Sequence, residues 1–375
     1  GDECLVIWSS KIAEYDKNKF FPKKARFVSK VDWCLKNYKQ DKKDFGNLSW
    51  KEFFPIFDRF KGIDFSYKNS FEMVSQTYQF FESLFEKEKP DAVISELPAG
   101  LFHHIAYYFC KKMNIPYLGF AVSRISKRID GLDMNFTCSK YEESFKKNNY
   151  RNLSKKEKGF TEGIVEQFIT HKKLPSYMGL AKIHFSQIGL VKHFLKRIEE
   201  SSAFLLRYFF QRKKFKNFDY ESEAILNNAI NSLWRAEKRK FRILFQKHIF
   251  DKFDSEDNFF IFPLHLQPEA STSVYAMYYC DQLNTIKNIA FSMPFPYKLY
   301  VKEHPVAVGT KPKSFYRKLK EIPNVVLISP YENVENLIKN SSGVIVLTST
   351  IGLEAALAGK PVYVLGNVFY SYHPF

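Results

Sequence analysis

The sequence predicts an α/β protein with two domains, each a mainly parallel sheet covered by helices, and a basic helical segment between them. Short apolar runs alternate with helix-like stretches in both the first and the last third of the chain, which is typical of β-α-β units. The 375 residues suffice for two domains of ordinary size. Hydrophobic residues make up 45% and aromatic residues 17%, a composition that excludes a disordered or fibrous chain.

Residues 1–140 are predicted to form the first α/β domain. An apolar run at Leu5–Trp8 indicates an early strand. The segment Pro90–Ile125 then shows an apolar run, a Pro/Gly break, a helix-like stretch and a second apolar run after Asn114. This order predicts a β-α-β unit of a Rossmann-like domain.

Residues 141–253 are predicted to form a helical connector or insertion, because long helix-period stretches rich in Lys and Phe replace the short apolar runs. Its basic amphipathic faces fit an anionic membrane surface. They equally fit the solvated faces of helices packed on the two domains, and the sequence leaves both interpretations open.

Residues 254–375 are predicted to form a second Rossmann-like domain. After a polar break at Asp254–Asn258, five short apolar runs alternate with four helical stretches, which predicts a parallel sheet covered on both faces. The runs are FFIFPL, YKLYVKEHP, NVVLI, GVIVLTS and PVYVLG, with helices expected near 273–290, 313–320, 334–339 and 352–358.

Charge and cysteine content narrow the partners and the compartment. Lys and Arg outnumber Asp and Glu by 57 to 40, a net charge of +17 that favours an anionic partner such as nucleic acid, an acidic membrane or a phosphorylated substrate. The five cysteines are scattered without a C-x-x-C pair, which fits a reducing cytoplasm. Since the first residues lack a signal-peptide pattern and no apolar stretch has membrane-spanning length, we expect a cytoplasmic protein.

In doubly wound sheets, ligands bind beyond the carboxyl ends of the strands. GVIVLTSTIGLEAALAGKP places hydroxyls and a glycine there, at a helix start that would bind a phosphate; the residues are Ser349, Thr350, Gly352 and Glu354. The alternative is an ordinary helix cap. In YKLYVKEHP, Lys302 and His304 end another strand, and the following proline forces a turn that can hold the imidazole near a phosphate oxygen.

Two further strand ends carry candidate carboxylates. Gln267 and Glu269 follow the first strand of the second domain, where a carboxylate can face the reacting sugar or orient an acceptor hydroxyl. Glu96 ends a strand of the first domain and is the candidate acid or base on the acceptor side. Arg124 and Arg128 follow the next strand and can hold an anionic sugar or acceptor. A helix-start charge, a cap or a solvated salt bridge is the alternative role for each.

No H-E-x-x-H motif, credible D-x-D pair or G-x-x-x-x-G-K-[ST] loop occurs, so neither a metal hydrolase nor a P-loop NTPase is indicated. We expect a mechanism without a metal or cofactor.

The motifs LQPEAS, KEHP and TSTIGLEAALAGKPVYVLGNVFY resemble those of bacterial capsular polysaccharide biosynthesis proteins, a family that includes Kdo transferases using CMP-Kdo. The resemblance covers Phe259–Tyr370. The HP pair and the Ser/Thr cluster are also similar to paired motifs of bacterial sialyl- and polysialyltransferases. Both comparisons imply the GT-B architecture, in which two Rossmann-like domains face a cleft. They also imply that His304, Ser349 and Thr350 bind the CMP phosphate, Glu354 the ribose, and Gln267 and Glu269 the transferred sugar.

The resemblance leads to one expected function with two alternatives. We expect a glycosyltransferase that moves an acidic, Kdo-like sugar from a CMP-activated donor to a glycan or glycolipid acceptor, with peripheral contact to the inner face of the cytoplasmic membrane and without nucleic acid. Its catalytic residues would be Glu96, Glu269 and His304. The alternatives are a nucleotide-sugar 2-epimerase of the same architecture and a non-catalytic capsule-assembly protein.

Overall fold

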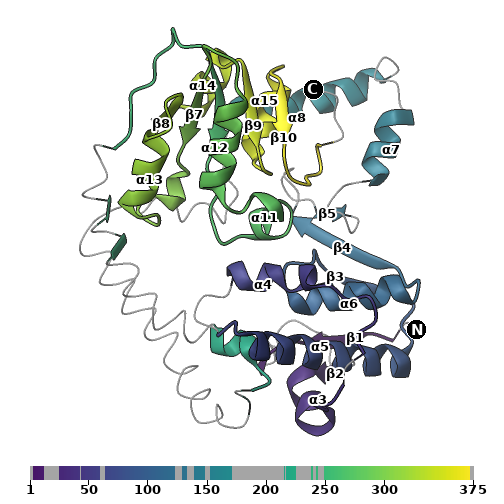
Figure 1. Ribbon diagram of the computed structural model, residues 1–375. Coiled ribbons are helices and arrows are strands. Elements are labelled where there is room, and N and C mark those ends of the chain that lie inside the picture. The colour runs from purple at the N-terminus through teal and green to yellow at the C-terminus, as the bar shows by residue number, and fades with distance from the viewer. Residues whose placement is uncertain are drawn as a thin grey trace, which may run out of the picture. The chain divides into compact units, whose positions relative to one another are not determined.

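A computed structural model of the chain describes most of the two α/β regions and parts of the segment between them (Figure 1). The described residues are 3–11, 25–42, 44–59, 64–122, 129–132, 139–147, 153–170, 215, 217–224, 238–239, 242–243 and 249–371.

The chain divides into two compact units, each of them discontinuous in sequence. The first comprises residues 1–93, 98–116 and 182–234, and the second comprises residues 94–97, 117–181 and 235–375. The predicted connector, residues 141–253, is therefore divided between the two compact units. The functional division at residues 140 and 253 stays a prediction.

The first unit is built on two parallel strands and a set of helices rich in aromatic residues. Strand β1 (Leu5–Trp8) pairs in parallel with β2 (Arg26–Ser29), so the strand expected at Leu5–Trp8 is confirmed. The helices are α3 (Lys30–Asn37), η1 (Trp50–Glu52), α4 (Phe54–Arg59), α5 (Tyr67–Glu88) and α6 (Leu101–Lys112). Helices α5 and α6 pack on each other through buried rings of Phe81, Phe102 and Phe109, among others.

The β-α-β unit predicted within Pro90–Ile125 is confirmed as β3 (Val93–Glu96), α6 and β4 (Tyr117–Val122). Sequence reasoning missed strand β5 (Ile129–Leu132), which pairs antiparallel with β4. Two helices of the basic segment are described, α7 (Ser139–Lys147) and α8 (Lys155–Thr170). None of the helices that the structure describes combines the length and apolarity needed to cross a membrane.

The second unit contains a five-stranded parallel sheet in the order β10-β9-β6-β7-β8 (Figure 1). Its strands are β6 (Phe259–Pro263), β7 (Lys298–Lys302), β8 (Val325–Ile328), β9 (Gly343–Val346) and β10 (Val362–Val364), as the apolar runs predicted. The helices are α11 (Ala270–Ser273), η4 (Met277–Tyr279), α12 (Gln282–Ser292), η5 (Pro305–Ala307), α13 (Lys313–Lys320), α14 (Val334–Asn340) and α15 (Thr350–Leu357).

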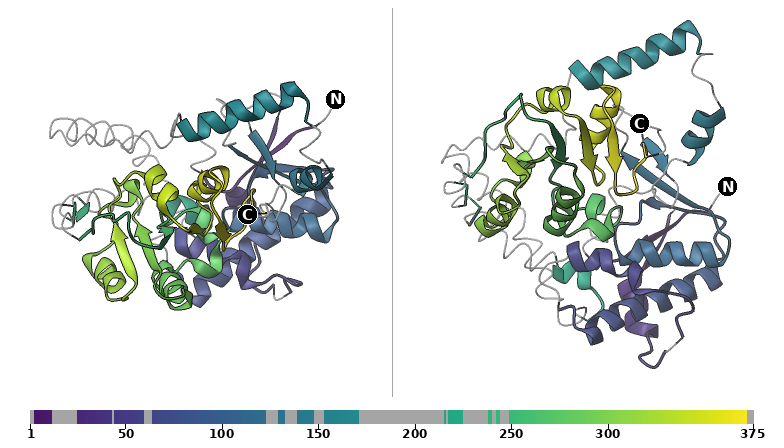
Figure 2. Two further views of the ribbon diagram at one scale, coloured as in Figure 1. Left: turned by 90° about the horizontal axis from the view of Figure 1, so that it is seen from above. Right: turned by 45° about the horizontal axis from the view of Figure 1, so that its top comes forward.

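One helix differs from the sequence prediction. The helix expected near 273–290 begins only at Gln282, because the Asp281 carboxylate caps it by accepting the Asn284 N–H at 3.1 Å. The preceding residues form the short α11 and η4 turns at the carboxyl edge of the sheet (Figure 2).

Alternating strand residues bury two apolar layers, one on each face of this sheet. Phe262, Leu299 and Leu327 pack with residues of α12 and α13 on one face. Ile261, Tyr300 and Ile328 pack with residues of α14 and α15 on the other. The sheet is therefore doubly wound, as predicted.

The strand order reverses at β6. From β6 the chain adds β7 and β8 on one side, and β9 and β10 then lie on the other side of β6. The helices that follow β6 and β9 consequently cover opposite faces of the sheet. A topological switch point of this kind is where doubly wound sheets bind ligands.

Candidate functional site

A hydrogen bond joins the two strand ends at the switch point. The backbone N–H of Thr348, after β9, donates to Nε2 of His265, after β6, at 3.2 Å. The Thr348 hydroxyl donates to the Ser271 carbonyl at 2.9 Å. Both Thr348 and His265 are buried, so these bonds lie in the interior at the switch point.

Helix α15 starts at Thr350, two residues after Thr348. Ser349 is its N-cap, and the Ser349 hydroxyl accepts the Ile351 N–H at 3.2 Å while its own proton remains able to donate. Thr350 is the first helical residue and is half-buried. Hydroxyls and N–H groups at a helix start favour an anion. The structure thus brings Ser349 and Thr350 to the switch point, as the phosphate prediction requires.

Gly352 allows α15 to approach its neighbours closely. A Cβ at this position would lie 2.6 Å from Tyr370 Oη and 2.9 Å from Val346 Cγ2. The Tyr370 hydroxyl in turn donates to the Ser349 carbonyl. Gly352 therefore acts through packing of the helix start, while Glu354 lies half-buried further along α15.

His304 is held in one orientation after β7. Its Nδ1 accepts the Val306 N–H at 3.1 Å, which assigns the proton of the neutral ring to Nε2. Burial lowers the pKa of His304; Glu303 opposes the shift, and Lys311 and Lys302 add to it. At neutral pH the ring is thus an uncharged Nε2–H donor.

Glu303 fixes the turn that carries His304. Its carboxylate is fully buried and accepts the His304 N–H at 2.7 Å and the Lys311 ammonium at 3.0 Å. The Tyr316 hydroxyl also donates to it. Four donor contacts on one carboxylate, counting both oxygens that Lys311 reaches, leave the K-E-H-P turn little freedom.

The Lys302 ammonium is bound by a carbonyl of the protein itself. Its side chain is 3% exposed, and Nζ donates to the Pro330 carbonyl, after β8, at 2.6 Å. The ammonium is directed to the edge of the sheet next to β8. A role for Lys302 in nucleotide binding stays a prediction.

Gln267 and Glu269 lie in the loop between β6 and α11. Both ends of the Gln267 amide are used within the protein: Nε2 donates to the Cys280 carbonyl at 2.8 Å, and Oε1 accepts from Gln282 at 2.8 Å. Glu269 is exposed, and its carboxylate accepts the Ser271 hydroxyl at 3.0 Å. Of the two, Glu269 is the one at the surface.

The remaining candidates lie elsewhere in the chain. Glu96 ends β3 with an exposed side chain, and its carbonyl accepts the Tyr117 hydroxyl at 2.9 Å. Arg124 and Arg128 lie outside the described residues. The roles assigned to these three residues stay predictions.

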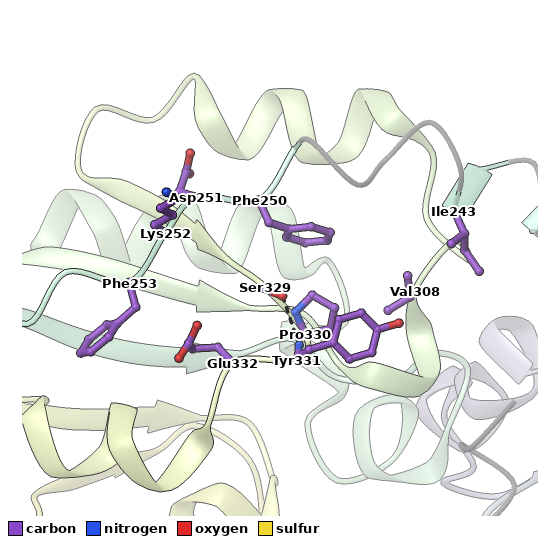
Figure 3. Close-up of a pocket in the computed structure, with 10 residues that line it drawn as sticks. All are labelled: Ile243, Phe250, Asp251, Lys252, Phe253, Val308, Ser329, Pro330, Tyr331 and Glu332. Carbon is purple, nitrogen blue, oxygen red and sulfur yellow. Dashed lines mark hydrogen bonds between the residues drawn. The ribbon is translucent and has the colours of Figure 1, made fainter. Parts of the chain in front are cut away.

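A pocket of about 670 Å³ opens beside the carboxyl end of β8 (Figure 3). Phe250, Tyr331, Pro330 and Val308 give it apolar and aromatic walls, and polar groups come from Asp251 and Ser329, among others. Tyr331 N–H donates to Ser329 Oγ at 3.2 Å, which shapes the turn after the strand (Figure 3). Sequence reasoning missed this pocket, since Phe250–Phe253 precede β6 in sequence and meet the outer edge of β8 only in the fold, where Asp251 bridges to Ile328.

The environment of His265 perturbs its titration. Burial lowers its pKa to about 4, with smaller contributions from His304 and Lys311 and an opposing one from the Pro263 carbonyl. This electrostatic coupling relates the ends of β6 and β7. Among the described residues, no cluster of three or more His, Cys, Asp or Glu side chains can hold a metal ion.

His265, Gln282, Glu303 and Lys311 were missed as site residues. Glu303 stands inside the KEHP motif, and His265 directly precedes the LQPEAS motif, so a search for buried polar residues beside a strand end would have found them. Nothing in the local sequence marks Gln282 or Lys311.

The sequence profile described as capsule polysaccharide biosynthesis protein matches residues 192–373. The comparison with curated proteins gives no match. Among solved structures, Thermosulfurimonas dismutans KpsC, a beta Kdo 2,7 transferase, is similar with 22% identity and a TM-score of 0.26, over 36% of this chain and 43% of that one. This chain therefore spans less than half of the length of that structure.

Two other solved structures cover more of the chain. The UDP-GlcNAc 2-epimerase from Methanocaldococcus jannaschii is similar with 14% identity and a TM-score of 0.24, over 94% of this chain and 74% of that one. A co-structure of S. aureus MnaA and UDP is similar with 13% identity and a TM-score of 0.24, over 100% of this chain and 81% of that one. Superposition scores of this size carry no information on function.

Proposed function

We propose that the chain is a glycosyltransferase of GT-B type, since residues 192–373 match the family described as capsule polysaccharide biosynthesis protein. It moves an acidic, Kdo-like sugar from a CMP-activated donor to a cell-surface glycan or glycolipid. The observation that carries the proposal is the arrangement of donors around one switch point: His304 Nε2–H after β7 and the α15 start after β9, with His265 between them after β6.

The charge at this edge suits a phosphate. The helix start contributes partial positive charge, and Ser349 and Thr350 contribute hydroxyl donors. Lys311 lies close enough to depress the pKa of both His265 and His304. A monoanionic or dianionic phosphate would find complementary potential without a metal ion.

The pocket beside β8 supports a nucleotide in particular. Its aromatic and apolar walls suit the face of a nucleobase, and polar groups at its edge suit the exchangeable groups of the base. Strand β8 is next to β7, so a base in the pocket directs its ribose and phosphate along the strand ends toward His304.

Transfer requires that the bond between the anomeric carbon and the phosphate oxygen breaks while the acceptor oxygen bonds to that carbon. His304 Nε2–H and the α15 start stabilise the charge that grows on the leaving CMP, a contribution that is largest in the transition state. The acceptor proton goes to a carboxylate, for which we propose Glu269 or Glu96. Arg124 and Arg128 are proposed to bind a carboxylate of the sugar or acceptor.

The test is calorimetric titration of the full chain with CMP, CDP and UDP, followed by transfer assays with CMP-Kdo. Preferential binding of CMP, with sugar transferred to a capsule glycan, is expected. Interconversion of UDP-GlcNAc without any acceptor would show the epimerase instead. Binding of none of the nucleotides would leave the non-catalytic assembly role.

A further inference from the structure

We infer that His265 and Gln282 are positioning residues that hold the β9–α15 turn, and with it the phosphate donors, against the carboxyl end of β6. The inference rests on the proposed function, because it concerns the same site.

His265 holds the turn from below. Its Nε2 accepts the Thr348 N–H at 3.2 Å, and Thr348 is the residue immediately before the Ser349 N-cap of α15. Thr348 is bound a second time by the bond of its hydroxyl to the Ser271 carbonyl at 2.9 Å. The backbone that enters the proposed phosphate-binding helix is thus tied to His265, in the loop after β6, and to Ser271, in α11.

Gln282 holds His265 in turn. Its Oε1 accepts the His265 N–H at 2.7 Å, and its Nε2 donates to the His265 carbonyl at 3.0 Å, so the amide pairs with the backbone of His265 as a neighbouring strand would. The same Nε2 also reaches Gln267 Oε1 at 2.8 Å. Gln282 is 3% exposed and begins α12. The chain just beyond β6 therefore cannot shift without breaking buried hydrogen bonds.

These bonds argue for positioning and against direct catalysis. The nitrogen of His265 that faces the turn is already occupied as an acceptor, and the ring is 6% exposed. Gln282 and Gln267 likewise direct their amides to protein partners. Gln282 offers no group to a ligand, and the second ring nitrogen of His265, Nδ1, is buried without a hydrogen-bond partner among the described residues. The bonds that both residues make determine where Ser349 and Thr350 lie.

The strand arrangement at the switch point explains why these positioning bonds are needed. Strands β6 and β9 are neighbours, but the helices that follow them leave on opposite faces of the sheet. The register pairs Phe260 with Gly343 and Ile261 with Val344, and the Ser342 N–H donates to the Phe259 carbonyl at 2.8 Å. Beyond these pairs, the bond between His265 and Thr348 fixes the positions of the two strand ends relative to each other. A displacement of about 1 Å of catalytic donors can cost about a hundredfold in rate.

The experiment compares CMP binding and CMP-Kdo turnover in five full-length proteins. They are wild type, His265→Leu, His265→Gln, Gln282→Met and Asn324→Leu. His265→Leu removes the acceptor of the Thr348 N–H, and His265→Gln supplies an amide oxygen in its place. Gln282→Met keeps the side-chain volume and removes the amide. Asn324 is the matched control, because its amide also binds a backbone carbonyl, that of Ala290, at 2.8 Å, but precedes β8 at the opposite edge of the sheet.

We expect His265→Leu to weaken CMP binding about tenfold and to lower kcat further, since the donors matter most in the transition state. His265→Gln should restore affinity to within about threefold of wild type, as the amide oxygen can accept the Thr348 N–H. Gln282→Met should lower affinity and kcat in the same order, and Asn324→Leu should change neither.

If wild type binds CMP and His265→Leu has the same affinity and kcat as wild type, the inference is overturned while the proposed function stands. Equal losses in His265→Leu and Asn324→Leu would also overturn it, because they would indicate general destabilisation. If amide exchange shows His265→Leu to be unfolded, Gln282→Met and the rescue by His265→Gln decide by the same criteria. A wild-type chain that binds no CMP, CDP or UDP refutes the proposed function, and the inference falls with it.

Discussion

Replacement of His265 by Gln should make the second unit less sensitive to acid. In the native chain the His265 pKa lies at about 4, against an ordinary value of 6.5. A histidine that is neutral when folded binds its proton only on unfolding. Its contribution to stability is therefore complete above pH 6.5 and is lost as the pH falls from 6.5 to 4.

The size of the effect follows from the two pKa values. A shift of one unit corresponds to about 1.4 kcal/mol, so the whole range amounts to about 3 kcal/mol, of which about 2 kcal/mol is lost between pH 7 and pH 5. Gln keeps an acceptor for the Thr348 N–H and does not titrate. Wild type should therefore lose about 2 kcal/mol more than His265→Gln over this interval.

Amide exchange measured by mass spectrometry is the suitable assay. The four tryptophans, at positions 8, 33, 50 and 234, all lie outside residues 249–371, so none is a probe within the strands and helices of this sheet. Opening free energies would be compared for peptides covering β6 and β9, after correction for the intrinsic pH dependence of exchange.

His104→Gln is the matched control. His104 lies in α6 of the first unit, and burial lowers its pKa to about 4 as well. This variant should reduce the acid sensitivity of α6 peptides and leave β6 and β9 unchanged. Equal loss of β6 and β9 protection in wild type and His265→Gln between pH 7 and pH 5 would refute the reasoning.

Four further substitutions test the site. His304→Ala should weaken CMP binding about tenfold or more by removing one hydrogen bond to a charged group, and should leave amide exchange of β7 unchanged; full transfer activity in this variant would contradict the phosphate assignment. Gly352→Ala should destabilise the α15 turn by about 1–3 kcal/mol, because the new methyl meets Tyr370 and Val346, and a denaturation midpoint equal to that of wild type would argue against this packing. Glu303→Gln should cost about 3–5 kcal/mol, since it leaves the Lys311 ammonium without its anion, and the double variant with Lys311→Met should recover part of the loss in urea denaturation. Tyr331→Ala should reduce CMP affinity by about fivefold, or about 1 kcal/mol, without affecting binding of inorganic phosphate; an unchanged CMP titration would exclude the pocket as the base site.

The elements of the second unit could be read from the sequence because each is encoded locally. Apolar runs of four or five residues bounded by Pro, Gly and Asn predict buried parallel strands, and all five occur where expected. The helix expected near 273–290 was wrong at its start, since periodicity alone does not reveal that Asp281 is the cap. Strand β5 was missed because IDGL carries little apolar pattern.

The candidate site was only partly predictable. His304, Ser349 and Thr350 stand next to strand ends in the sequence, so their place at the carboxyl edge follows from the elements themselves. The Gln267 amide binds Cys280 and Gln282, which are distant by 13 and 15 positions, and its contact with a sugar stays a prediction. Such pairing depends on where α11 and α12 pack, and no local pattern encodes it.

Propensity, periodicity and capping are local properties. The sequence alone therefore predicts the α/β class of this protein, the strands of its second unit, and the hydroxyl and imidazole side chains at the strand ends. The position of β6 between β7 and β9, and with it the contact of His265 with Thr348 at the switch point, is visible only in the folded chain. Strand order results from long-range packing of helices on the two faces of the sheet, and residues separated by 83 positions come into contact only once that packing is complete.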